Sequence, residues 1–153
     1  QDDPKGALDA YAHVLQMRPG DQDSLRGAAR SALKAGQYKD AYGYYGALVK
    51  MNGNRENLKG LVSAAVGLKD QDKIIDACTM FLKKNKDHDV AISLAYAYES
   101  RAAKHEGRSR LDDLSRALEA YKTALSINPR SKVASEKIPE LSIETIKLRK
   151  SLQ

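Results

Sequence analysis

The sequence predicts an all-α protein built from antiparallel helix hairpins that stack on one another and end in a capping helix. A pattern of small and aromatic residues recurs along the chain at successive offsets of 34, 33 and 43 residues. Within each copy, these residues keep the spacing of one face of a helix. None of the predicted helices is apolar enough to bury its face alone, so each hairpin needs a neighbouring copy on each side. We therefore expect one domain of stacked hairpins.

Residues 21–53 hold the clearest copy of the pattern. A first helix is predicted over residues 25–35 and is broken at Gly36, and a second helix starts at Tyr38. The expected core positions of the first helix are small or aliphatic, namely Leu25, Ala28, Ala29 and Ala32. Those of the second helix include larger residues and are Ala41, Tyr45, Leu48 and Val49. The two helices form a helix–turn–helix hairpin.

The recurrence of this pattern divides residues 1–153 into successive parts. They are a half repeat at 1–20, repeats at 21–53, 54–86 and 87–130, and a capping helix at 131–153. The half repeat supplies only the second helix of a hairpin, with Pro4 suited to its first turn. The repeat at 87–130 carries an insert near residues 100–110, which accounts for its longer offset.

A capping residue precedes the first helix of each repeat and the last helix of the chain. These residues are Asp21, Asn54, Asp87 and Ser131. Each places a side-chain oxygen where it can accept a hydrogen bond from a backbone N–H of the first turn, which has no partner inside the helix. Carboxylates follow two residues after three of these caps, at Asp23, Glu56 and Asp89. They complement the helix dipole, so we assign these acids a structural role and no catalytic one.

These residues resemble the tetratricopeptide repeat (TPR) family, which has a period of about 34 residues, a small residue where paired helices touch, and a closing Pro. The residues that carry the resemblance are the turn Gly36-Gln37-Tyr38, the pair Ala41 and Tyr45, and the later Ala117, Tyr121 and Pro129. It covers roughly residues 4–131 and departs from the family at Gly53, Lys86 and Ile74. The resemblance implies a right-handed superhelical stack, a TPR-like α-solenoid. Its concave groove would be lined by the first helices and would bind another protein or a peptide.

The candidate binding residues lie on these first helices. Arg26, Arg30 and Lys34 are four residues apart and form one stripe, and later repeats place Lys59 with Ser63, then Ile92 with Tyr96, at the matching positions. The groove would thus pass from basic to apolar and suit a ligand with carboxylates at one part and an apolar side chain at another. The alternative is that the stripe is only a solvated helix face.

A chaperone-tail adaptor is disfavoured. Some family members bind the C-terminal tails of chaperones, and they hold the tail carboxylates with lysines, asparagines and an arginine in the groove. Gly27, Gly60 and Ser93 stand where those asparagines or the arginine would be expected. We expect these small residues to permit close helix packing instead.

Two other stretches have alternative interpretations. The insert contains Arg101, Lys104, Arg108 and Arg110. It either lengthens both helices, with Gly107 at the turn, or forms a mobile basic loop, and it is either a solvated linker or a secondary patch for phosphate or an acidic partner. In the second helix of residues 21–53, Gly43 and Gly46 either let tyrosines pack between helices, with Tyr45 inward, or leave Tyr42 or Tyr44 exposed to a partner.

We predict no enzymatic activity, no cofactor and no metal. His13, His88 and His105 are scattered, and Cys78, on the expected buried face, has no second cysteine at metal-binding spacing. No phosphate-binding loop or nucleophile elbow is present in the sequence. No apolar run has the length that a membrane span needs. The chain starts inside a repeat without Met, so we expect a fragment or processed product that hides any targeting segment, and we favour the cytoplasm only slightly.

The function predicted from the sequence is a non-enzymatic protein-interaction module, with a scaffold or adaptor role. Two alternatives stay open. The net charge of +6 and the arginine-rich insert are compatible with a nucleic-acid-binding helical repeat, although the charge is moderate and spread along the chain. The open N-terminal end is compatible with a unit that self-associates end to end.

Overall fold

The computed structural model describes residues 3–153, and within them the chain forms eight α-helices and no strand. The all-α prediction is confirmed. The helices are α1 (Pro4–Met17), α2 (Gln22–Lys34), α3 (Tyr38–Met51), α4 (Arg55–Leu68), α5 (Gln71–Leu82), α6 (His88–Ala102), α7 (Gly107–Ile127) and α8 (Lys132–Ser151). Residues 1 and 2 of the predicted half repeat lie outside the described residues.

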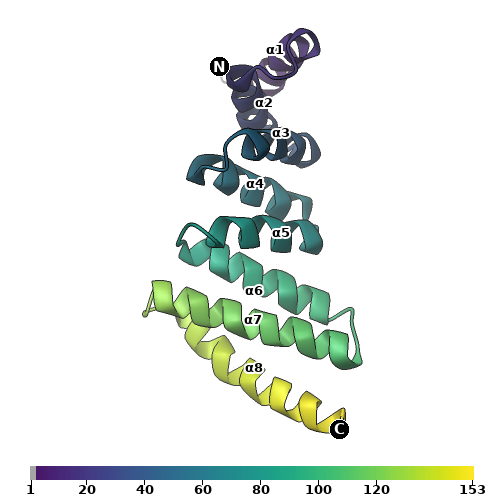
Figure 1. Ribbon diagram of the computed structural model, residues 1–153, viewed down its shortest axis with the longest axis vertical. Coiled ribbons are helices and arrows are strands. Elements are labelled where there is room, and N and C mark those ends of the chain that lie inside the picture. Colours follow the sequence, from purple (N-terminus) through teal and green to yellow (C-terminus); the bar gives the residue numbers. More distant parts are fainter. Residues whose placement is uncertain (1–2) are drawn as a thin grey trace. The chain divides into compact units, whose positions relative to one another are not determined.

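The helices belong to two compact units, one that ends at Asp70 and one that runs from Gln71 to Gln153. In the first unit, α1 to α4 pack each on the next, and α2 also contacts α4. In the second unit, α5 to α8 pack each on the next, and α6, α7 and α8 run in alternating directions (Figure 1). The boundary separates α4 from α5, the two helices of predicted repeat 54–86. The assignment of residues 1–153 to a single domain stays a prediction.

Local signals in the sequence set the helix starts. The four predicted caps all accept hydrogen bonds from backbone N–H groups of the following turn, with Asp21 bonded to Ser24 at 2.9 Å and Asn54 to Asn57 at 2.9 Å. Asp87 and Ser131 cap α6 and α8 in the same way. Gly36, with a φ of +71°, takes the left-handed conformation that lets the chain leave α2 and enter α3.

The predicted core faces are largely buried. The small residues Ala28, Ala29 and Ala32 of α2 have no exposed surface, and Tyr45 of α3 is also buried. Cys78 is fully buried, which confirms that it lies in the core. An exception is Tyr11, which matches Tyr45 in the repeat pattern and is partly exposed.

Glycines allow close helix contact, but at other positions than the ones expected in α3. A Cβ at Gly43 or Gly46 would meet no atom within 4 Å, so the prediction that these glycines make room for tyrosines is wrong. A Cβ at Gly27 would overlap the ring of Tyr11, and one at Gly60 would overlap the ring of Tyr45. The close-packing role predicted for these two small residues is therefore confirmed. The tyrosines come from second helices and the glycines from the first helices that follow them.

The insert near residues 100–110 lengthens the two helices around it. The α6 helix extends to Ala102, residues 103–106 form the connection, and α7 begins at Gly107 with a φ of +57°. The alternative of a mobile basic loop is wrong. Arg101 is held by Asp113 of α7 at 2.7 Å and by Asp72 of α5 at 2.9 Å, and these contacts explain why the helical form is stable.

The last helix, α8, packs on α7 and buries one face. Leu141 is buried, whereas Ile146 is 53% exposed. Five positions along a helix correspond to a rotation of about 140°, so these two residues do not share a face. Thr145, four positions after Leu141, occupies the buried place instead.

The two kinds of glycine give a paired prediction. Gly60→Ala should lower the free energy of unfolding by about 1–3 kcal/mol, because the added methyl group displaces the buried Tyr45 ring. Gly43→Ala should raise it by about 0.5–1 kcal/mol, because the site is open and alanine favours the helix. Urea unfolding followed by circular dichroism measures both. Equal effects of the two substitutions would contradict the conclusion that Gly60 makes a close contact and Gly43 does not.

The Arg101–Asp113 pair gives a second prediction. The Asp113 side chain is only 4% exposed. Arg101→Met should therefore cost about 3 kcal/mol of unfolding free energy, because it leaves a buried carboxylate without its main charge partner. Arg101→Met combined with Asp113→Asn should cost less than the sum of the two single changes. Arg108→Met, at an exposed position of α7, is the control and should leave stability unchanged.

The same pair should make stability depend on pH. Burial acts to raise the pKa of Asp113, but the hydrogen bonds and charges of Arg101 and His105 outweigh it and hold that pKa below its ordinary value of 3.8. A carboxylate whose pKa falls on folding stabilises the protein above its unfolded pKa, and this contribution is lost as the pH falls through the folded value. The stability difference between the parent and Asp113→Asn should thus be constant near neutral pH and shrink below about pH 4. A difference that persists in strong acid would contradict this.

Candidate functional site

The basic stripe predicted on α2 lies at the surface of the first unit. Arg30 and Lys34 are exposed, and Arg26 is half-buried. Arg26 donates a hydrogen bond to Asp23 of its own helix at 3.3 Å. Arg30 donates one to Glu56 at the start of α4. Both arginines of the stripe therefore already have carboxylate neighbours in the folded chain.

The ion pair between Arg30 and Glu56 is exposed to water. The two side chains are 57% and 59% exposed. The hydrogen bond and the charge of Arg30 lower the pKa of Glu56, so this carboxylate is ionised at neutral pH. Exposed ion pairs of this kind are screened by solvent and hold their partners weakly. The Arg30–Glu56 pair therefore contributes little to the stability of the fold.

The α4 helix continues the same surface with the predicted residues Lys59 and Ser63. Ser63 is exposed, and its hydroxyl donates to the backbone carbonyl of Lys59 at 3.1 Å. Tyr45 of α3 packs against Gly60 of the same helix. Burial raises the pKa of the Tyr45 hydroxyl, which keeps this side chain neutral beside Arg30 and Glu56.

In the second unit, the predicted residues Ile92 and Tyr96 lie on α6. Tyr96 is 46% exposed, and its ring meets the ring of Tyr121 of α7 edge to face, with centroids 6.1 Å apart. Tyr121 donates its hydroxyl to Glu99, which also accepts from Lys137 of α8 at 3.0 Å. Burial and the contact with Glu99 raise the pKa of Tyr121. The exposed ring of Tyr96 thus packs on one side against a tyrosine that is itself fixed by hydrogen bonding.

The four basic residues predicted near the insert do not form one patch of unpaired cations. Arg101 is held by Asp113 and Asp72, and Arg110 is held by Glu144 of α8 at 2.8 Å. Lys104 and Arg108 are exposed. A binding role for this set stays a prediction, but two of its cations are already bound within the fold.

The described chain offers neither a metal site nor a membrane span. Across residues 3–153, His, Cys, Asp and Glu side chains do not assemble in a group of three or more that could hold a metal ion. The helices of the same range lack the length and apolar character that a bilayer crossing requires. Two of the three histidines contact other helices, since His88 bonds to Ser131 at 2.8 Å and His105 to Asp113 at 2.8 Å.

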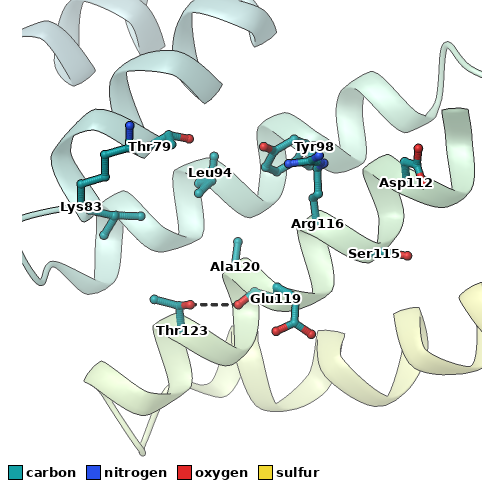
Figure 2. A pocket seen from close by; sticks show the side chains of 11 residues that line it. Thr79, Lys83, Leu94, Tyr98, Asp112, Ser115, Arg116, Glu119, Ala120 and Thr123 are labelled. Atoms are coloured by element: carbon teal, nitrogen blue, oxygen red, sulfur yellow. Dashed lines mark hydrogen bonds between the residues drawn. The ribbon is translucent and has the colours of Figure 1, made fainter.

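Sequence reasoning missed an open groove of 720 Å³ in the second unit, formed by α5, α6 and α7 (Figure 2). We refer to it as the α5–α7 groove. Its lining residues are Thr79, Leu82, Lys83, Leu94, Tyr98, Asp112, Ser115, Arg116, Glu119, Ala120 and Thr123. The signal in the sequence was weak because Leu94 and Tyr98 read as ordinary core positions. Lys83, just after α5, and Arg116 of α7 come from parts of the chain that only the fold brings to one groove.

Comparison with known proteins agrees with this architecture. A sequence profile of the tetratricopeptide repeat family matches residues 1–65. A search of curated proteins found no match. Among solved structures, the crystal structure of MamA aligns with a TM-score of 0.69 at 24% identity, covering 98% of this chain and 86% of that chain. This likeness establishes the helical-repeat fold.

Helical repeats of this kind present extended binding surfaces, and the match supports a general role as a protein-interaction scaffold. Residues 1–65 are thus similar to the tetratricopeptide repeat family, and residues 71–153 continue the chain with packed helices of the same all-α repeat fold.

Proposed function

We propose that this chain is a non-enzymatic interaction module that binds a peptide or a segment of a partner protein through the exposed faces of its first helices. The α2 and α4 face takes carboxylates of the partner at Arg26, Arg30 and Lys34. The α6 face takes an apolar side chain at Ile92 and Tyr96. The family match supports the general role as a scaffold, and the residues of each face support the ligand chemistry.

The observation that carries the proposal is the state of the arginines on α2. Both are held only by exposed carboxylates, and the Asp23 side chain, which pairs with Arg26, is 94% exposed. Such pairs contribute little to folding, so the protein loses little when a partner replaces them. A partner carboxylate gains charge-assisted hydrogen bonds in a surface that becomes partly dry on binding. The stripe is thus suited to exchange of acidic groups.

The Tyr96 face supports the second contact. Its ring is exposed but already oriented by Tyr121, so little side-chain entropy is lost when a ligand packs on it. Tyrosine is also among the residues that most often dominate binding energy at interfaces. An apolar side chain of the partner is the group that best matches this surface.

Charge reversal tests the basic face. Arg26→Glu combined with Arg30→Glu should weaken binding of a natural partner by about 1–3 kcal/mol. Lys39→Glu with Lys50→Glu makes the same change in net charge on exposed positions of α3 and should leave the affinity unchanged. The partner is chosen by affinity capture on the parent protein alone, before the variants are tested. Tyr96→Ala should also weaken its binding.

Calorimetric titration measures these affinities, and thermal unfolding checks that each variant is folded. A partner that binds the arginine variant as tightly as the parent would place the interaction on another surface. Tight, sequence-selective binding of RNA at about 0.15 M salt, with an affinity that falls steeply as salt rises, would favour a nucleic-acid binder instead.

A substitution that should strengthen binding, and not weaken it, gives a sharper test. Glu56→Gln removes the carboxylate that competes for Arg30, so it should strengthen binding of an acidic partner several-fold while lowering the protein's own negative charge by one. Asp76→Asn, at an exposed position of α5, makes the same charge change away from Arg30 and controls for long-range attraction. Equal gains from both variants would show that Glu56 does not compete at Arg30.

A further inference from the structure

We propose that the α5–α7 groove is a second binding site, which takes an acidic segment of a partner protein that carries one apolar anchor side chain. This site is separate from the first-helix faces and is lined mainly by second helices. Two features of the groove support this ligand: an apolar floor and two cations without ion-pair partners. The groove also lies on the opposite side of α6 from Tyr96, so it is separate from the first-helix face.

The floor of the groove is apolar and only partly covered. Leu82 of α5 and Leu94 of α6 are half-buried, whereas Ala120 of α7 is buried behind them. Figure 2 shows Leu94 between the wall that carries Thr79 and Lys83 and the side that carries Tyr98 and Arg116. An apolar side chain that enters here covers the two leucines and removes their surface from water, which favours binding.

Two cations border this floor. Lys83 and Arg116 are both exposed, and across residues 3–153 neither forms an ion pair or a side-chain hydrogen bond. Arg101, by contrast, lies at the neighbouring polar recess and is held by Asp113 and Asp72. The groove thus offers two positive groups that the fold itself does not use, one just after α5 and one on α7. Carboxylates on either side of an apolar anchor complement them.

The acids of the groove do not cancel this preference. Glu119 is paired with Lys122 of its own helix at 2.7 Å, and both side chains are exposed to water, which screens the charge of Glu119. Asp112 is exposed at the far end of the groove from Lys83 in Figure 2. The ligand is therefore acidic near Lys83 and Arg116, and a donor group near Asp112 is tolerated.

The groove and the Tyr96 face lie on different sides of α6. Leu94 and Tyr98 are each two positions from Tyr96, and two positions along a helix correspond to a rotation of about 200°. The first-helix face and the groove can consequently be occupied at the same time. The chain then joins two partners, or two segments of one partner.

Amide chemical shifts of isotope-labelled protein test the site. The probe is a synthetic peptide with one leucine between two pairs of glutamates, Glu-Glu-Leu-Glu-Glu. We expect a cluster of shifts at Leu82, Leu94 and Ala120 that saturates on titration. Replacing the peptide leucine by serine, or its glutamates by lysines, should weaken this response by about tenfold.

Substitutions in the protein complete the test. Lys83→Glu with Arg116→Glu should abolish the response in the groove while any shifts at Arg26 and Arg30 remain, so failure of this site is distinct from failure of the first-helix face. Lys83→Gln with Arg116→Gln should give at least a partial loss and serves if the reversed variant does not fold. Lys39→Glu with Lys50→Glu is the matched charge control and should bind as the parent does. No shifts in the groove, an equal response to the serine or lysine peptide, or unchanged binding by the folded variants would each overturn the proposal.

Discussion

The contact between a tyrosine ring and a small residue on the next helix is the constraint on which the first unit depends. The Tyr11 ring lies where Gly27 would have a Cβ, and the Tyr45 ring lies where Gly60 would have one. A third contact of the same kind joins Tyr38 and Gly67. Each ring fills the space that the small residue leaves, so the helices approach closely. The glycines weaken the helices in isolation, and the packing of the rings offsets that cost.

This mode of packing determines which surfaces are available for binding. Because small residues and tyrosines form the contacts between helices, the long charged side chains of α2 and α4 are not needed in the core. Arg26 and Arg30 lie outside it and pair with exposed carboxylates. In the second unit, Tyr121 has no exposed surface and supports the ring of Tyr96 from beneath. The core therefore orients the candidate binding residues without using them.

The parts of the fold that depend on neighbouring residues were predictable from the sequence. Caps such as Asp21 bond within one turn, and core positions such as Ala28 and Ala32 follow from helix geometry alone. What failed depends on residues far apart in the chain. Gly60 differs from Gly43 because a tyrosine ring of another helix packs on Gly60 and none packs on Gly43. The sequence alone does not show this contact. The α5–α7 groove was missed for the same reason, since its cations belong to parts of the chain that only the fold brings together.

Burial explains why two similar ion pairs have different consequences. The carboxylate of Asp113 is almost fully buried and is shared by Arg101 and His105, so the pair is part of the structure and is costly to break. The carboxylate of Glu56 is exposed, so its pair with Arg30 is held weakly and can be exchanged. Arg101 was among the candidate basic residues because the sequence shows its charge but not the carboxylates that bind it. The same reasoning separates Arg101 from Lys83 and Arg116, which form no ion pair within residues 3–153. The number of arginines in a stretch is thus a poor guide to binding, and the exposure of their carboxylate partners is a better one.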